Sequence, residues 1–328
     1  MQMSRHWKLI SILFAGVTVQ GYAPASLSQS YPAKPVHIVI GYPPGGGTDA
    51  TARLISQKLS ESFGQPVVVE NRPGASGLIA IEKVAQSAPD GYTLVLIASS
   101  SILAHALSPA PSFDFERDLA PISLATVQPF VLLVNPVLPV RTVKDLVALA
   151  HRQPGKLNYG SSGVGGASHL AGELFHLLAK VKLVHVPYKG GGESVVAVAA
   201  GQIELTFASS TSALPLLTSG KLRALGVTTP KRTSLLPADV PTLAESGVPG
   251  YDHVVWYAIL GRTGMPGDMV TRLNSTLAKI VNTSEMKESF RRQGLEAQTN
   301  TPPQLAALVR AEFVKNANLI KAANLKSE

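Results

Sequence analysis

The sequence predicts an α/β fold divided into two lobes, and three observations lead to this prediction. The chain has 328 residues, which suits two domains with a core each. Its composition is globular, with 45% hydrophobic and only 15% charged residues. Continuous apolar strand patterns alternate with amphipathic helix patterns, and a unit of strand, glycine loop and helix occurs twice. Strands of this kind indicate parallel sheets covered by helices on both faces.

The first 25 residues have the pattern of a secretory signal peptide. Arg5 and Lys8 form a basic region, and residues 9–19 form an apolar run that is too short to span a bilayer. A small-x-small cleavage pattern ends at Ala25. We therefore expect an exported, periplasmic protein. The chain contains no cysteine, so disulfides, a thiolate nucleophile and a cysteine-based zinc site are excluded.

The charge pattern argues against nucleic acid as a partner. The formal net charge is +8, but the basic residues form no run and aromatic residues make up only 6% of the chain. A stacking platform for bases needs more aromatic side chains than this. We interpret the basic excess as a general bias that helps to attract anionic small molecules.

The first unit of strand, glycine loop and helix covers residues 36–63. A β-branched run, Val36–Ile40, leads into a Pro/Gly loop, and apolar residues at helical spacing follow over residues 52–63. Gly64 is expected to end this helix. Three consecutive glycines in the loop supply bare backbone. The N–H groups of such a loop and the positive end of the helix dipole point at the same spot. This arrangement is the simplest protein device for holding an anion.

The next segments complete a first sheet. Strands are expected over residues 66–70 and 92–98, and a helix over residues 78–88. The second of these strands ends in the serines Ser99–Ser101. Because ligands of such sheets bind at the carboxyl ends of the strands, the glycine loop and the serine cluster are expected to share one crevice.

Residues 119–135 differ from the preceding segments because two extended runs flank Gln128-Pro129 without a helix between them. A chain crossing from one lobe to the other would have this appearance. Thr142 is expected to cap a helix that extends to His151. The second unit follows, with a Gly/Ser loop over residues 160–169 and a helix that we expect to present Leu170, Leu174, Leu177 and Val181 on one face.

The rest of the chain supplies further strands and helices. Strands are expected over residues 182–186, 203–208 and 222–228, and the return crossing over residues 251–260. A helix of small residues is expected after Glu193, ending at Ala200. Further helices are expected over residues 241–246, 268–281, 284–293 and 303–325.

The enzyme and nucleotide readings of these motifs are weak. A phosphate-binding P-loop needs Gly-Lys-Ser/Thr after its glycines, whereas Gly46-Gly47 is followed by Thr48-Asp49. There is no Gly-x-Ser-x-Gly nucleophile elbow. His169 and His176 lack the four-residue spacing of a metal-binding pair. We predict no catalytic residue, no cofactor and no metal. Each glycine loop alone is also explained as a tight turn, but three such loops together favour recognition of a carboxylate.

Several motifs resemble the periplasmic solute-binding proteins of the tripartite tricarboxylate transporter group, also called the Bug family. The motifs that carry the resemblance cover nearly the whole chain after the signal: Tyr31-Pro32-x-Lys34-Pro35, Pro44-Gly45-Gly46-x-x-Asp49, Val69-Glu70-Asn71-Arg72-Pro73-Gly74-Ala75-x-Gly77, Ala88-Pro89-Asp90-Gly91-Tyr92-Thr93-Leu94, Val186-Pro187-Tyr188-Lys189-Gly190, Gly220-Lys221-Leu222-Arg223-Ala224-Leu225 and Val240-Pro241-Thr242-Leu243-Ala244-Glu245-Ser246-Gly247. One departure is His105, followed by Ser108-Pro109, where the family often has Asn-Pro; this change is expected to act at the distal end of the ligand.

The resemblance implies a type II periplasmic binding protein (a Venus flytrap), in which each lobe is a central sheet flanked by helices and the ligand cleft lies between the lobes. Lobe 1 is expected to comprise residues 26–130 and 250–328, and lobe 2 residues 131–249, with crossings near 120–135 and 250–260. The ligand-binding residues that it implies come from the two units and from three less certain strand ends: Tyr42, Gly45, Gly46, Thr48, Asp49, Ser99, Ser161, Gly163, Gly165, Ser168, His169, Tyr188, Lys189, Gly190 and Ser209.

The expected function is capture of a small carboxylate, such as a di- or tricarboxylate, an amino acid or an aromatic acid. The expected partners are the inner-membrane subunits of a transporter or a sensor protein, and the expected state is a monomer. Two alternatives stay open at this point: a receptor that senses its ligand without transport, and an exported hydrolase on a similar sheet. Asp49 is expected to act either in ligand selectivity or as a capping group.

Overall fold

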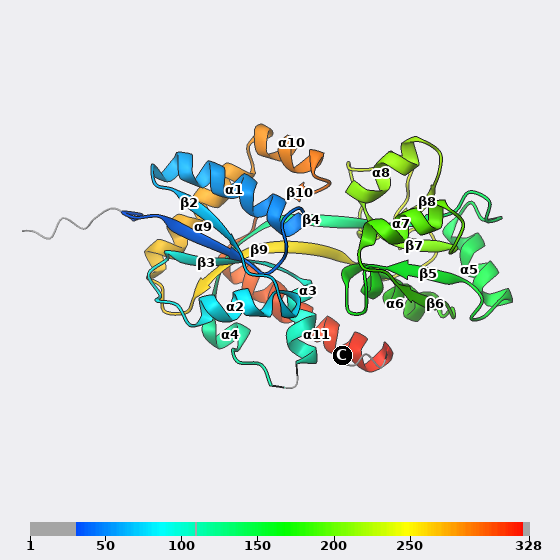
Figure 1. The fold of residues 1–328 in the computed structure, drawn as a ribbon, viewed down its shortest axis with the longest axis horizontal. Coiled ribbons are helices and arrows are strands. Elements are labelled where there is room, and N and C mark those ends of the chain that lie inside the picture. Colours follow the sequence, from blue (N-terminus) through cyan, green and yellow to red (C-terminus); the bar gives the residue numbers. More distant parts are fainter. Residues whose placement is uncertain (1–30, 109, 324–328) are drawn as a thin grey trace, which may run out of the picture. The chain divides into compact units, whose positions relative to one another are not determined.

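Two long antiparallel strands, β4 (Leu119–Val134) and β9 (Val254–Arg262), connect the two halves of the structure (Figure 1). The computed structural model describes residues 31–108 and 110–323, and the predicted signal peptide, residues 1–25, lies outside them. The first half of β4 pairs with β9, and its last residues pair with two strands of the other half. The strands fall on the segments where the sequence places the crossings, and the exact limits of the lobes stay a prediction.

The strands of lobe 1 form a mixed sheet. Strand β1 lies between β2 and β3, parallel to both, and β9 then runs antiparallel to β3. These strands are β1 (Val36–Ile40), β2 (Val67–Asn71), β3 (Thr93–Ala98) and the short β10 (Glu296–Ala297), which pairs with β4. The parallel sheet expected from the sequence is therefore correct for β1 to β3, while the two crossing strands add antiparallel pairs.

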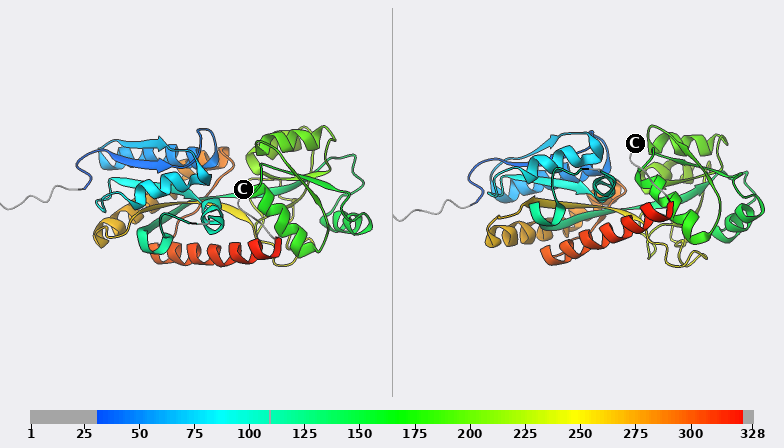
Figure 2. Two further views of the ribbon diagram at one scale, coloured as in Figure 1. Left: turned by 60° about the horizontal axis from the view of Figure 1, so that its bottom comes forward. Right: turned by 90° about the horizontal axis from the view of Figure 1, so that it is seen from below.

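Helices cover the sheet of lobe 1 on both faces (Figure 2). They are α1 (Gly47–Phe63), the 3-10 turn η1 (Ala75–Gly77), α2 (Leu78–Ala85), α3 (Ser100–Leu107), α4 (Phe115–Asp118), α9 (Gly267–Val281), α10 (Ser284–Arg292) and α11 (Pro302–Ala323). Ala52, Ile55 and Leu59 of α1 are almost fully buried, as their helical spacing predicts. Gly64 adopts a left-handed conformation with φ 63° at the end of α1, which confirms its predicted role.

Lobe 2 has the same arrangement on a smaller scale. Strand β5 is parallel to β6 and β7, while β7 and β8 pair antiparallel with the last part of β4. The elements are α5 (Val143–Arg152), β5 (Asn158–Ser161), α6 (Ala167–Ala179), β6 (Val184–Pro187), α7 (Gly191–Ala199), β7 (Leu205–Ser209), α8 (Ser210–Thr218) and β8 (Arg223–Val227). Thr142 caps α5 in a capping box with Asp145, which confirms the predicted cap.

Each half has its own hydrophobic core. One cluster includes Val39, Ile97 and Trp256 in lobe 1, and another includes Val131 and Val198 in lobe 2. A third, small cluster joins helices α3, α6 and α11 through Leu103, Leu170 and Leu319. Helix α11, drawn in red in Figure 2, therefore contacts both halves. Within the described residues, no helix has the length and apolar character needed to cross a bilayer.

Three predictions of local structure are wrong. Residues 119–134 form one strand instead of two runs, because β9 pairs with it as far as Pro129. Residues 241–246 form turns and one isolated bridge, not a helix. The apolar face expected for α6 is also displaced: the helix ends at Ala179 and buries Leu170, Ala171 and Phe175, while Leu177 is 45% exposed.

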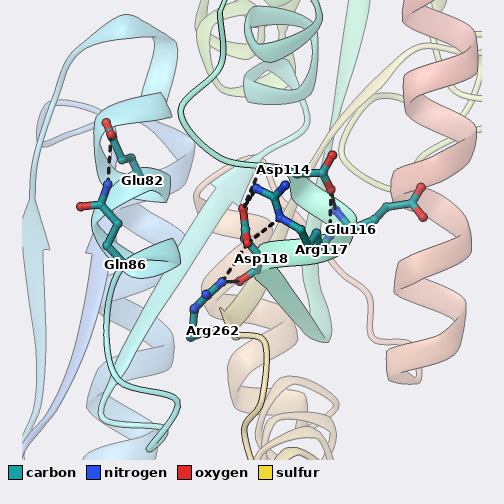
Figure 3. A network of polar contacts seen from close by, with 7 residues as sticks. All are labelled: Glu82, Gln86, Asp114, Glu116, Arg117, Asp118 and Arg262. Atoms are coloured by element: carbon teal, nitrogen blue, oxygen red, sulfur yellow. Dashed lines mark hydrogen bonds and ion pairs between the residues drawn. The ribbon is translucent and has the colours of Figure 1, made fainter.

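A polar network secures the end of lobe 1 where β4 begins and β9 ends (Figure 3). The Arg262 guanidinium donates to the backbone oxygen of Asp118 at 2.9 Å and to its carboxylate at 3.1 Å. Arg117 donates to the same carboxylate, and Asp114 caps the short helix α4. These contacts hold the two crossing strands together at the start of β4 and the end of β9. This end lies outside both cavities described below.

Candidate ligand-binding site

The first loop, residues 42–49, presents backbone at the start of α1. Its N-cap residue is Gly46, which has extended backbone and no side-chain cap. Gly45 has a φ of 96°, a conformation that favours glycine. A Cβ atom on Gly47 would lie 2.3 Å from the Tyr257 hydroxyl, so glycine is needed there for the close approach of α1 to β9. The first N–H groups of α1 are thus left without a side-chain acceptor from the N-cap residue.

A buried carboxylate holds this loop in place through hydrogen bonds. Asp49 is 5% exposed and accepts a hydrogen bond from the Gly45 N–H at 3.1 Å. It also accepts from Arg53 Nε at 2.9 Å and from Asn71 Nδ2 at 3.1 Å. Burial alone would raise the pKa of Asp49, but these hydrogen bonds outweigh it and the pKa is lowered. The geometry matches the capping role that was one of the two expectations for Asp49.

The second loop, residues 161–169, has the same construction at the start of α6. Gly166 is an extended N-cap without a side-chain cap, and Gly163 and Gly165 have φ values of 108° and 73°. The Gly165 N–H donates to His169 Nδ1 at 3.1 Å. The Ser162 N–H donates to Ser168 Oγ at 2.8 Å. Both loops therefore use a side chain in the first turn of the helix to hold the residue that precedes the N-cap.

A third helix start has the same form. Helix α7 begins after the N-cap Gly190, again without a side-chain cap, and the Lys189 N–H donates to Glu193 Oε2 at 3.3 Å. Other helices have side-chain caps: Thr142 at α5 and Thr283 at α10, which line neither cavity, and Ser209 at α8, whose start lines one of them. Because an uncapped helix start carries partial positive charge and free N–H donors, it attracts anions.

These three helix starts surround two adjoining cavities of about 540 and 620 Å³. The residues that line both cavities are Tyr42, Gly46, Gly47, Gln128, Phe130 and Ser162. The remaining lining residues are small, hydroxyl-bearing or apolar, apart from Gln293. None of the described residues that line either cavity carries a charged side chain. The cavities therefore offer backbone N–H groups, hydroxyls and an amide to a ligand, without a fixed cation.

The tyrosines at the cavities are held in place as neutral phenols. The Tyr42 hydroxyl donates to the Ser76 backbone oxygen at 2.9 Å and contacts Ser100 Oγ at 2.9 Å. The Tyr257 hydroxyl donates to Gln128 Oε1 at 2.7 Å. Burial raises the pKa of Tyr42 and of Tyr257. Both phenols therefore act as hydrogen-bonding groups and do not ionise at neutral pH.

The structure brings eight of the fifteen predicted site residues to the cavities. These are Tyr42, Gly45, Gly46, Thr48, Gly165, Ser168, Gly190 and Ser209. The other seven do not line them: Asp49, Ser99, Ser161, Gly163, His169, Tyr188 and Lys189. Several of these seven support the loops through hydrogen bonds; Ser161 Oγ, for example, accepts from the Gly163 N–H at 3.1 Å. Which of the fifteen residues contact a ligand stays a prediction.

The crossing strands contribute cavity residues that the sequence did not single out. Gln128 and Phe130 come from β4, and Val255 and Tyr257 from β9. One signal was available, because Gln128 is the one amide side chain in a mostly apolar crossing segment, residues 119–134. The aromatic and apolar residues gave no such signal, since they have the pattern of ordinary strand residues.

His105 lies away from both cavities. Its ring packs against Phe113, Phe115 and Phe313 at centroid distances of 4.9, 5.1 and 5.8 Å. Burial lowers its pKa. The expectation that this departure acts at the distal end of the ligand finds no support in this position, because the ring packs against these three phenylalanines and lines neither cavity. Within residues 31–108 and 110–323, no three potential metal-ligating side chains gather around one point.

Comparison with known proteins agrees with this geometry. The family described as "Tripartite tricarboxylate transporter family receptor" (TctC) matches residues 51–325. The protein BugT of Bordetella pertussis is 34% identical over 321 residues, which is 97% of this chain and 98% of BugT. The structure of Rpa4515 of R. palustris with adipate is 35% identical, with a TM-score of 0.78, and the match covers 90% of this chain and 99% of that one.

A second solved structure points in the same direction. MatC (Rpa3494) of Rhodopseudomonas palustris, with bound malate, is 29% identical with a TM-score of 0.73, and the match covers 88% of this chain and all of that one. The expected two-lobed α/β binding-protein fold and the suspected family are thus both confirmed. The chain belongs to the TctC family of tripartite tricarboxylate transporter receptors.

Proposed function

We propose that this protein is a periplasmic solute-binding receptor that captures a small carboxylate between its lobes and delivers it to a tripartite tricarboxylate-type membrane transporter. One observation carries the proposal: the uncapped starts of α1, α6 and α7 converge on two adjoining cavities that no charged side chain of the described residues lines. Partial positive charge and N–H donors suit an anion, and the absence of a fixed counter-ion suits one that must be released.

Among carboxylates, the lining favours an aliphatic dicarboxylate. The two cavities adjoin, so one ligand can place a polar group in each, while Phe130, Phe207 and Val255 offer apolar surface to a carbon chain. The bound adipate and malate of two similar proteins support this choice. Malate and adipate also differ in chain length. Comparing their Kd values therefore measures how far apart the two carboxylate positions lie in the site.

The test begins with the full chain expressed in a bacterial host and purified from the periplasmic fraction, then freed of co-purified ligand. Thermal unfolding is measured with adipate, malate and hexanoate, and with adipamide as a neutral control of the same shape. At a ligand concentration of about a hundred times Kd, binding stabilises the folded state by about 2.7 kcal/mol. We expect this shift with a dicarboxylate and none with adipamide.

Two results would contradict the proposal. One is the absence of a shift with every carboxylate tested; the other is equal stabilisation by the neutral amide, which would remove the argument from helix charge. Delivery is tested separately by uptake of the labelled acid into spheroplasts that contain the transporter subunits. Uptake should require added receptor, and binding without uptake would assign the protein to sensing.

A further inference from the structure

A cluster of titratable side chains, two buried and one half-buried, lies next to the second loop and outside both cavities. His169 is 5% exposed, and its ring stacks on that of His185 with centroids 4.1 Å apart. The His185 ring in turn stacks on fully buried Tyr159 at 5.0 Å. Because none of the three lines a cavity, any effect they have on a ligand must act through the loop.

The contacts of His169 specify its protonation state. Nδ1 accepts the hydrogen bond from the Gly165 N–H, so this nitrogen carries no proton. The ring proton therefore sits on Nε2, which lies 3.8 Å from Glu173 Oε1. The Tyr159 hydroxyl donates to that same carboxylate oxygen at 2.5 Å. The loop geometry thus requires a neutral His169 with its proton on Nε2.

His185 supports the other half of the loop. Its Nε2 lies 2.6 Å from Ser161 Oγ, and Ser161 Oγ accepts the Gly163 N–H at 3.1 Å. Gly163 and Gly165 are the two loop residues with positive φ. The Gly165 N–H is bound by His169 of the cluster, and the Gly163 N–H is bound by Ser161, which contacts His185. The cluster controls the backbone at the two positions where the loop turns.

The surroundings keep the imidazoles neutral. Burial lowers the pKa of His169, and burial together with the nearby His169 lowers the pKa of His185 to about 4. Opposing this, Glu173 would favour the charged form of His185. The titratable groups around the second loop are Glu173 and His176 on α6, Tyr159 on β5 and His185 on β6. His253, before β9, lies near Lys315 of α11.

We propose that His169 is a positioning residue for ligand binding: its neutral Nδ1 holds Gly165, and protonation of this nitrogen releases the second loop and weakens the grip on the ligand. The proposal rests on the proposed function. A protonated Nδ1 is a donor that opposes the Gly165 N–H, so the loop loses an acceptor at the place where α6 begins. Ligand affinity is therefore expected to fall as the pH falls through the pKa of His169.

The first test needs no ligand. In protein with isotope-labelled glycine, the Gly165 amide resonance is followed by NMR together with the His169 ring resonance while the pH is lowered. We expect the amide and the ring to titrate together, and the amide of H169N to lose this titration because Asn Oδ1 accepts without protonating. A Gly165 amide that does not move when the ring titrates would overturn the proposal.

The second test uses adipate as the probe and measures Kd by calorimetry at about pH 7.5 and at the lower pH at which the NMR titration shows the His169 ring to be protonated. H169F keeps the ring and removes the acceptor, so its Kd at the higher pH should rise about tenfold. H169N keeps an acceptor and should bind at least about threefold tighter than H169F. H151F, the same change at an exposed site on α5, is the matched control.

The pH dependence provides the decisive comparison. Protonation of adipate itself weakens binding by all variants equally, so the ratio of wild-type to H169N affinity isolates the contribution of His169. This ratio should fall on going to the lower pH; a constant ratio, or H169F binding as tightly as the wild type, would overturn the proposal. If adipate binds to no variant, the proposed function fails for this ligand, and the NMR titration still decides the role of His169.

Discussion

The two ligand loops share one backbone design, but one is held by a charged side chain and the other by a neutral one. In each loop the glycine before the N-cap donates its N–H to the side chain four residues later, at 3.1 Å in both cases. In the first loop the acceptor is the Asp49 carboxylate, and in the second it is the neutral imidazole of His169. The same geometry is thus fixed once by a charged group and once by a group that must remain uncharged.

The difference lies in what surrounds each acceptor. Asp49 accepts further hydrogen bonds from Arg53 and Asn71, which stabilise its negative charge and lower its pKa. His169 is packed against another imidazole and a phenol, where burial lowers its pKa and disfavours a positive charge. We therefore expect the first loop to keep its shape in mild acid and the second loop to lose it. The following predictions test this contrast, beginning with the largest expected effect.

Replacing Asp49 with alanine should destabilise the protein most. D49A leaves the Gly45 N–H and the Asn71 amide without their buried acceptor, and the loss in unfolding free energy should be about 3 kcal/mol. Chemical denaturation of D49A and D49N measures it. D49N retains one acceptor oxygen and should lose less than D49A. Unfolding of D49A within about 0.5 kcal/mol of the wild type would contradict the view that this carboxylate holds the loop.

Valine substitutions should affect the two loops differently, because the backbone conformation at the substituted glycine differs. G163V forces a β-branched residue to a φ of 108°, which should cost about 2 kcal/mol of stability. At Gly46 the φ is −88° and nothing lies within 4 Å of an added Cβ, so G46V should change stability by less than about 0.5 kcal/mol. G46V should nevertheless weaken adipate binding, because its side chain enters both cavities. Equal losses of stability in the two variants would argue against this distinction.

Acid should destabilise the region of the second loop before that of the first. His185 and His253 have pKa values lowered to about 4 and about 3 by burial, and the pKa of His169 is also lowered. These groups are neutral in the folded protein, whereas the unfolded chain takes up protons below about pH 6.5. Stability is therefore complete above about pH 6.5 and falls, by about 1.4 kcal/mol per pH unit for each such histidine, as the pH decreases toward these values.

Denaturation at a series of pH values checks this sign. The contribution of Asp49, whose pKa is lowered, is retained above about pH 4 and lost only below it. The slope between about pH 6.5 and 4.5 should decrease in H169N and remain unchanged in H151N, the exposed control. A stability that is independent of pH over this interval would show that the histidines do not carry the effect.

The smallest effect is expected for the partner of Asp49. Arg53 is 54% exposed and its ion pair with Asp49 is screened by solvent. R53M should therefore lower the unfolding free energy by only about 0.5 kcal/mol. Denaturation of R53M beside D49A measures the contrast. A loss as large as that of D49A would mean that the ion pair, and not the hydrogen bonds to the backbone and Asn71, holds the first loop.

The sequence predicted the repeated unit and most of its boundaries because these depend on local patterns. The β-branched run before the first glycine loop, the helical spacing in α1, Gly64 and the Thr142 cap are all confirmed. Helices α3 and α8, which follow the serine clusters, were missed. Both are short, and α8 contains Pro215, so neither has a periodicity that distinguishes it from a loop.

The positions of the predicted site residues could not be derived in the same way. Asp49 and Ser168 are both in first helical turns, yet Ser168 lines a cavity and Asp49 lies behind its loop. Sequence spacing places a residue on a helix turn, but the direction of its side chain depends on the strand and loop packed against it. His169 faces inward because His185 and Tyr159, on strands β6 and β5, provide its stacking partners.

By itself, the sequence determined the α/β class, the two strand–loop–helix units, the absence of disulfides and, through its motifs, the family. These properties follow from local periodicity, glycine and capping chemistry, and composition, each of which acts over a few neighbouring residues. Only the tertiary structure decided that Gln128, Phe130 and Tyr257 of the crossing strands line the cavities, and that one loop is anchored by a charged group and the other by a neutral one. These features depend on which distant residues become neighbours, and that is set by the pairing of β4 with β9 and by the packing of helices on the sheets.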